Sequence, residues 1–123
     1  PYVTSTLYNL VNPYHRQHFN EFSFDFFQPR KLLGSAAETG GVMFQKAFHR
    51  FHYMPEFVDK PDAEKDFARL HWFNVVKKID FGLMAIKDAA RMFTITGEHS
   101  QRMQNRFDNL LAARKPYPGK KAD

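Results

Sequence analysis

Phenylalanine occurs 14 times among the 123 residues of this chain, and aromatic residues make up 16% of it. A buried aromatic side chain removes roughly 150–250 Å² of surface from water. A single domain of this length has a small interior, because short chains bury a smaller fraction of their surface than long ones do. We therefore expect some of the aromatic rings to be covered by something other than this chain.

The stretch from about residue 60 to residue 96 has the strongest helical pattern. Asp62 and Glu64 lie in its opening turns and Lys87 lies near its end, which is the distribution of charge that the helix dipole favours. Gly97 follows as a residue typical of helix ends. The pattern predicts an all-α fold: a small helical protein with one long central helix over about 60–96, two or three shorter helices and irregular termini.

Apolar side chains occupy more than half of the circumference of this expected helix. On a helical wheel of about 100° per residue the charged residues gather in one arc, although Phe73 and Met84 fall inside that arc. A helix that lies on a single core needs only a modest apolar stripe. Either a partner subunit covers the second side, or the helix is the centre of a compact bundle. In the first case, the predicted partner interface consists of Phe67, Leu70, Trp72, Val76, Ile79, Phe81, Leu83, Ile86 and Phe93.

The N-terminal part of the chain contains a typical helix start. Asn12 suits the N-cap and Pro13 the first helical position, and a helix from there to about Phe22 fits the spacing of the residues that follow. Residues 22–28 fit either a helix or a strand, because phenylalanines alternate with polar residues at their start. We expect no second strand to pair with this segment, and an unpaired strand would leave its backbone hydrogen bonds unmade.

Two further helices are expected. Ser35 and Glu38 match a capping box, and a helix that begins there would end before Pro55. A second amphipathic stretch carries apolar residues on one side from Met103 to Leu111, which predicts a helix near the C-terminus.

Four histidines are the candidates for a metal site. His15 and His18 are three residues apart, as are His49 and His52, so each pair would share one face of a helix and all four rings could meet at one metal ion. The alternative, which we favour, is that these are surface groups or partners of carboxylates. The chain has no cysteine, no Glu-x-x-His pair and no glycine-rich nucleotide loop. We therefore expect no cofactor and no enzymatic activity.

The net charge of +5 is concentrated near the C-terminus, where residues 102–123 contain six basic and two acidic residues. This distribution predicts a single helical domain over residues 1–115 and a basic tail over residues 116–123. The tail and the residues before it are either solvated or contact an anionic partner, RNA or lipid headgroups, through Arg114, Lys115, Lys120 and Lys121. No run approaches the roughly 18 apolar residues that a membrane span needs. Whether an initiator methionine or a presequence precedes Pro1 is left open.

In size, basic charge, phenylalanine content and expected helicity, the chain resembles the accessory subunits of large mitochondrial membrane complexes. This resemblance is carried by composition and by no motif. It implies a non-catalytic structural subunit of an inner-membrane complex, such as a respiratory complex or ATP synthase, that packs aromatic faces against neighbouring protein subunits. The alternative is an RNA-contacting protein of a ribonucleoprotein particle such as a ribosome. A small helical metal-binding protein or enzyme is the third hypothesis.

Overall fold

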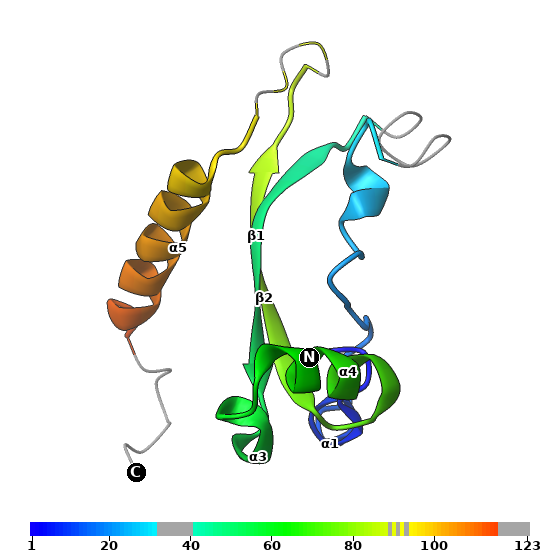
Figure 1. Cartoon of the computed structure of the whole chain (residues 1–123). Coiled ribbons are helices and arrows are strands. Elements are labelled where there is room, and N and C mark those ends of the chain that lie inside the picture. Colours follow the sequence, from blue (N-terminus) through cyan, green and yellow to red (C-terminus); the bar gives the residue numbers. More distant parts are fainter. Residues whose placement is uncertain (32–40, 89, 91, 93, 116–123) are drawn as a thin grey trace.

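The computed structural model describes residues 1–31, 41–88, 90, 92 and 94–115. Its centre is an antiparallel ribbon of two strands, β1 (Phe44–Tyr53) and β2 (Val76–Ala85). One side of the ribbon is lined by the N-terminal segment, with helix α1 (Thr6–Leu10) and the 3₁₀ helix η1 (Asp25–Phe27), and the other side by helix α5 (Gly97–Ala112) (Figure 1). The short helix α3 (Pro55–Val58) and helix α4 (Asp62–His71) connect the two strands at one end of the ribbon.

A β-bulge in β1 determines which side chains meet which neighbour. Lys46 pairs with Leu83 and Phe48 with Gly82, so Ala47 is an extra residue without a partner in β2. Successive side chains of a strand point to opposite faces, and an extra residue reverses that alternation. Lys46 therefore lies on the face of the N-terminal segment, whereas the ring of Phe48 lies on the opposite face against α5.

The predicted all-α fold with a long central helix over about 60–96 is wrong. Helix α4 occupies only the first third of that stretch, and residues 76–85 form strand β2. The helix ends at His71, since Trp72 has an extended backbone, and Asn74 then turns the chain toward β2 in a left-handed conformation with φ of 59°, which asparagine tolerates better than most residues do. The β-branched pair Val75 and Val76 follows, and such residues favour a strand.

Gly97 begins a helix instead of ending one. It is the first residue of α5, and the hydroxyl of Thr96 caps that helix by accepting a hydrogen bond from the amide of His99 at 3.2 Å. The expected helix from Met103 to Leu111 is confirmed as part of α5.

Two of the other expected helices are wrong, because the structure has a strand in one segment and irregular chain in the other. Residues 44–53 form β1 and not the helix that was expected to end before Pro55, while the capping box at Ser35 lies outside the described residues. The segment after Pro13 is not helical up to Phe22 but consists of turns and extended chain. The sequence of residues 22–28 fits either a helix or a strand, and in the structure only η1 is regular within this segment.

The core is small and lies at the α4 end of the ribbon. Its buried members are Tyr2, Ala68, Val75 and Val76, and Phe51, Tyr53, Phe57 and Ile79 pack against them. Within the part of the chain that the structure describes, five hydrophobic side chains are buried and sixteen large ones are exposed. None of the helices described is long and apolar enough to cross a membrane.

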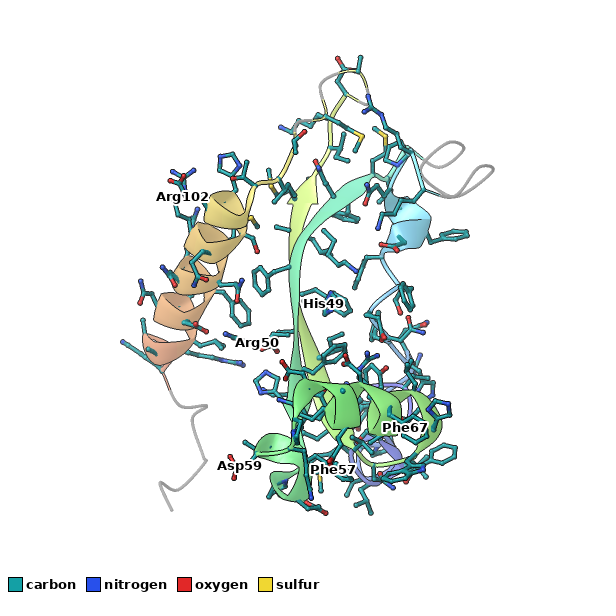
Figure 2. The ribbon with its side chains drawn as sticks, viewed as in Figure 1. His49, Arg50, Phe57, Asp59, Phe67 and Arg102 are labelled. Atoms are coloured by element: carbon teal, nitrogen blue, oxygen red, sulfur yellow. The ribbon has the colours of Figure 1, made fainter. Side chains whose placement is uncertain are left out.

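Helix α5 is attached to the ribbon through Arg50 and Phe48 of β1. The guanidinium of Arg50 donates to both carboxylate oxygens of Asp108, at 2.8 and 3.2 Å, and its central carbon lies 5.5 Å from the centre of the Phe107 ring. Arg50 points from the ribbon toward α5 in Figure 2. The rings of Phe48 and Phe107 are 6.1 Å apart in an edge-to-face arrangement. An exposed ion pair therefore contributes to holding this helix.

Acid is expected to loosen α5 from the ribbon. The hydrogen bonds from Arg50 hold the pKa of Asp108 below its usual range. The ion pair therefore contributes fully above the pKa of an unfolded aspartate, about 3.9, and its contribution is lost as the pH falls through the lower folded value. As the pH falls through this lower folded value, the NMR signals of α5 should move toward those of an Asp108→Asn variant. In that variant the signals should change little with acid, and equal titration in both proteins would contradict the expectation.

Candidate protein interaction surface

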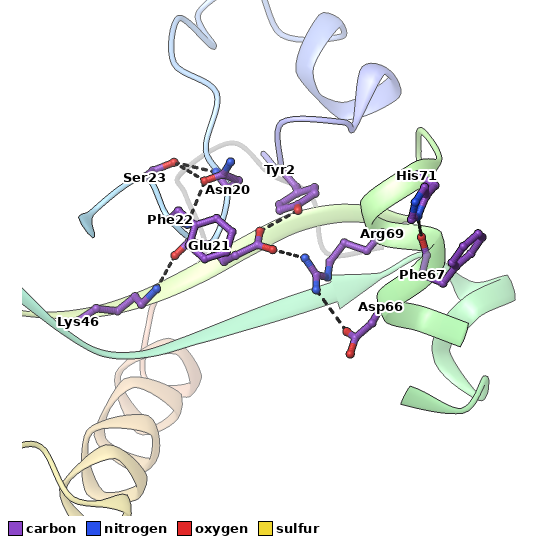
Figure 3. A network of polar contacts seen from close by, with 10 residues as sticks. All are labelled: Tyr2, Asn20, Glu21, Phe22, Ser23, Lys46, Asp66, Phe67, Arg69 and His71. Atoms are coloured by element: carbon purple, nitrogen blue, oxygen red, sulfur yellow. Dashed lines mark hydrogen bonds and ion pairs between the residues drawn. The ribbon is translucent and has the colours of Figure 1, made fainter. Parts of the chain in front are cut away.

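A buried polar network fixes α4 to the N-terminal segment (Figure 3). The hydroxyl of Tyr2 donates to one oxygen of Glu21 at 2.8 Å, and Arg69 of α4 forms an ion pair with the other oxygen. The side chains of Glu21 and Arg69 are only 8% and 10% exposed. Arg69 also pairs with Asp66 at 3.3 Å, and its guanidinium lies 4.5 Å from the centre of the Phe51 ring. One arginine thus joins three segments of the chain.

The network stabilises the charged form of Arg69. Burial lowers the pKa of this guanidinium, but the hydrogen bond with Tyr2 and the charge of Glu21 outweigh that effect, so the pKa is raised overall. Burial also raises the pKa of Tyr2. The ammonium of Lys46 adds a hydrogen bond to the backbone carbonyl of Glu21, as Figure 3 shows. The orientation of α4 is therefore set by contacts in the interior.

On its outer side, α4 carries an apolar patch that the rest of the described chain does not cover. We define this patch as Leu7, Phe67, Leu70, Trp72 and Phe73, whose exposed fractions are between 54% and 70%. Leu7 comes from α1 and is brought to the end of α4 by Asn74, whose side-chain oxygen accepts a hydrogen bond from the Leu7 amide at 3.1 Å. Asn74 thus brings Leu7 to the end of the molecule at which the other members of the patch lie.

Beside the patch, α3 and α4 enclose a groove of about 470 Å³. We call it the aromatic groove; its lining residues are Phe57, Lys60, Ala63, Glu64, Phe67, Ala68 and Trp72. The ring of Trp72 is 6.4 Å from that of Phe57 and 6.1 Å from that of Phe67, to which it is perpendicular. Phe57 and Phe67 are labelled at this end of the molecule in Figure 2. Ala68 belongs to the buried core, so the groove rests on a packed base.

Protein-family models, curated proteins and solved structures were compared with this chain. None of them matches.

The structure describes eight of the nine residues of the predicted partner interface and places them in three environments. Phe67, Leu70 and Trp72 are exposed and lie in the apolar patch. Val76 is completely buried in the core. The remaining described members are partly buried in or beside the ribbon: Ile79, Phe81, Leu83 and Ile86. Phe93 lies outside the described residues.

The four candidate metal ligands do not meet. His15 and His18 lie in the N-terminal segment, where a ring nitrogen of His15 is 3.1 Å from the carbonyl of Tyr8. His49 and His52 are on a strand, where residues three apart point to opposite faces. His49 points toward the N-terminal segment in Figure 2, whereas His52 lies 2.6 Å from a carboxylate oxygen of Asp80. Among the residues that the structure describes, no three His, Asp or Glu side chains are grouped as metal ligands.

The predicted anionic contact lies only partly within the described chain. Arg114 and Lys115 are exposed after the end of α5, and Lys120 and Lys121 lie outside the described residues.

Sequence reasoning missed the Glu21–Arg69 ion pair and two aromatic members of the surface, Phe57 and Phe73. The pair joins residues 48 positions apart, and no local pattern indicates it. For Phe73 there was one signal, its position among the charged residues of the helical wheel. An aromatic ring on the polar side of a helix is either a docking residue or a sign that the helix has already ended, and here the helix has ended.

Proposed function

We propose that this protein is a non-catalytic accessory subunit that binds another protein through the apolar patch. The observation that supports the proposal is the exposure of Leu70, Trp72 and Phe73 together at the end of one helix. Soluble monomers rarely expose large contiguous apolar surfaces, and such surfaces mark interaction sites. Aromatic residues are also enriched at the centres of protein interfaces. Membership of a mitochondrial inner-membrane complex stays a prediction that rests on composition.

Nucleic-acid contact is the second candidate, and the charge of α5 favours it. Arg102 and Arg106 are exposed on this helix, as are Arg114 and Lys115 after it, and none of the four has an acidic partner within the described chain. Clustered basic side chains of this kind suit a phosphate backbone. The apolar patch, in contrast, offers nothing to phosphate. The two candidates therefore use different surfaces and can be tested separately.

The test compares charged substitutions on two equally exposed leucines. The tagged full-length protein is purified gently from its source, with and without nuclease, and the proteins that travel with it are quantified. Leu70→Asp is expected to lose the major partner by at least tenfold, because a charge at the centre of an apolar interface must be desolvated. Leu110→Asp on α5 is the matched control, since Leu110 is 63% exposed and Leu70 is 64% exposed. Circular dichroism confirms that both variants are folded.

Retention of the partner by Leu70→Asp at the level of the control would contradict the proposal. So would a purified protein that is a monodisperse monomer, binds no hydrophobic dye and has no co-purifying protein. Loss of the partner on nuclease treatment alone would favour the nucleic-acid candidate instead.

A further inference from the structure

We infer that the aromatic groove binds a basic segment of the partner protein, with one large apolar side chain inside the groove and lysines or arginines on either side of it. The inference rests on the proposed function, because it names the chemistry of the partner at the same end of the molecule. It is carried by three observations: the charge around the groove, the carboxylates that have no partner, and the arrangement of the rings.

The region that encloses the groove is acidic in an otherwise basic protein. Residues 56–66 contain five acidic and two basic residues, a net charge of −3, whereas the whole chain has a net charge of +5. All five carboxylates are on exposed residues: Glu56, Asp59, Asp62, Glu64 and Asp66. Charge complementarity at an interface steers association and selects partners of opposite sign.

Three of these carboxylates are available to a partner. Asp62 is paired with Lys65 at 3.0 Å and Asp66 with Arg69 at 3.3 Å. The other three, Glu56, Asp59 and Glu64, have no ion pair or hydrogen bond within the described part of the chain. Glu64 lines the groove, while Glu56 and Asp59 flank its lining residue Phe57 in the chain. Basic residues beside the apolar anchor would neutralise Glu64 at the groove and find further carboxylates on α3.

The rings provide the site for the anchor. The volume of the aromatic groove, about 470 Å³, falls within the range of pockets that enclose small organic groups, about 300–1,000 Å³. Phe67 and Trp72 are both more than half exposed, so burial by an anchor would remove apolar surface from water. Aromatic faces also attract lysine and arginine side chains, which adds to the preference for a basic segment. Lys60 is the one cation that lines the groove among the residues described.

The same charges argue against other occupants. Nucleic acids and anionic membranes would bring phosphates next to Glu64 and into an acidic region of the surface, and like charges at an interface are costly. A second copy of this chain would have to present a basic surface to the groove, and its binding is an outcome that the experiment separates.

The experiment uses the only tryptophan in the chain, Trp72, as a reporter inside the groove. A synthetic peptide with one phenylalanine flanked by two lysines on each side is titrated into the full-length protein while the Trp72 emission is recorded. We expect a saturable shift of the emission that weakens as salt is added. A peptide with glutamates in place of the lysines should bind at least tenfold more weakly.

Charge reversal identifies the site. Glu64→Lys is expected to weaken binding of the basic peptide by at least tenfold, while the matched control Glu98→Lys, an exposed carboxylate on α5, leaves it unchanged. Equal binding of both peptides, equal binding by both variants, or the absence of any saturable shift would overturn the inference. Sedimentation of the protein alone supplies a further arm: a dimer that Glu64→Lys dissociates would place a second copy in the groove and overturn it as well.

The failure of this inference and that of the proposed function can be told apart. If the native partner is lost from Leu70→Asp but retained at full level by Glu64→Lys, the accessory role stands and the basic segment is wrong. If Leu70→Asp retains the partner, the proposed function fails whatever the peptides do.

Discussion

Replacement of Glu21 by alanine is expected to lower the free energy of unfolding by about 3–5 kcal/mol. The substitution removes the carboxylate that pairs with the nearly buried Arg69 and accepts the hydroxyl of Tyr2. Arg69 would keep only its exposed partner Asp66, and a largely buried charge that loses its buried partner costs far more than the ion pair contributes. Since domains of this size are stable by about 5–15 kcal/mol in total, this is a large share.

Urea unfolding followed by circular dichroism measures the effect. Asp66→Ala is the control, because Asp66 is the second, exposed partner of Arg69 and exposed pairs are worth about 0–1 kcal/mol. The double variant Glu21→Ala/Arg69→Met should recover much of the loss, since it leaves no buried charge. Equal, small losses from Glu21→Ala and Asp66→Ala would show that the network does not fix α4.

Replacement of Gly82 by alanine is expected to cost about 1–3 kcal/mol. A methyl group at Gly82 would overlap the ring of Phe48, which lies directly across the ribbon. The ring would have to shift to make room, and a shift would alter its edge-to-face packing with Phe107 of α5. The substitution should therefore both destabilise the ribbon and displace α5.

The matched control is Gly97→Ala. A methyl group at Gly97 meets nothing within 4 Å, and alanine is favoured over glycine in helices by up to about 1 kcal/mol. Combining Gly82→Ala with Phe48→Leu should cost less than the sum of the two single changes, because the smaller side chain makes room for the methyl group. Additive losses, or a Gly82→Ala protein as stable as Gly97→Ala, would rule out the steric explanation.

The sequence patterns predicted helix correctly over the residues of α4 and from Met103 to Leu111 in α5, but they continued the first helix through β2 and replaced β1 by a helix. In β1, Phe44, Phe48 and Phe51 follow one another at spacings of four and three, which imitates a helix although Phe48 and Phe51 lie on opposite faces of the strand. In β2, both faces are covered, one by the N-terminal segment and the other by α5, so apolar residues appear on both and the usual alternation is lost. A periodic pattern is informative only where one face meets solvent.

The candidate surface was accessible to sequence reasoning only in part. The apolar character of Phe67, Leu70 and Trp72 on the expected helix over about 60–96 predicts them as interface residues, and all three are exposed. The aromatic groove was not, since it depends on α3 bringing Phe57 next to Trp72. The network around Glu21 could not be predicted from the sequence either, because an ion pair between distant segments produces no periodic pattern of residues.

One side of helix α4 holds the fold together, and the opposite side is available to a partner protein. Its inward residues, Ala68 and Arg69, belong to the core and the buried network, and its outward residues, Phe67 and Leu70, contribute nothing to either. Substitutions of the outward residues can therefore change which partner protein is bound without destabilising the fold. Substitutions of the inward residues are expected to change the orientation of the whole helix and thereby to alter binding at its outward side. Variants that weaken binding of the partner therefore fall into two kinds. Variants of the outward residues keep the melting temperature of the protein, whereas variants of the inward residues lower it, so a thermal melting curve distinguishes the two.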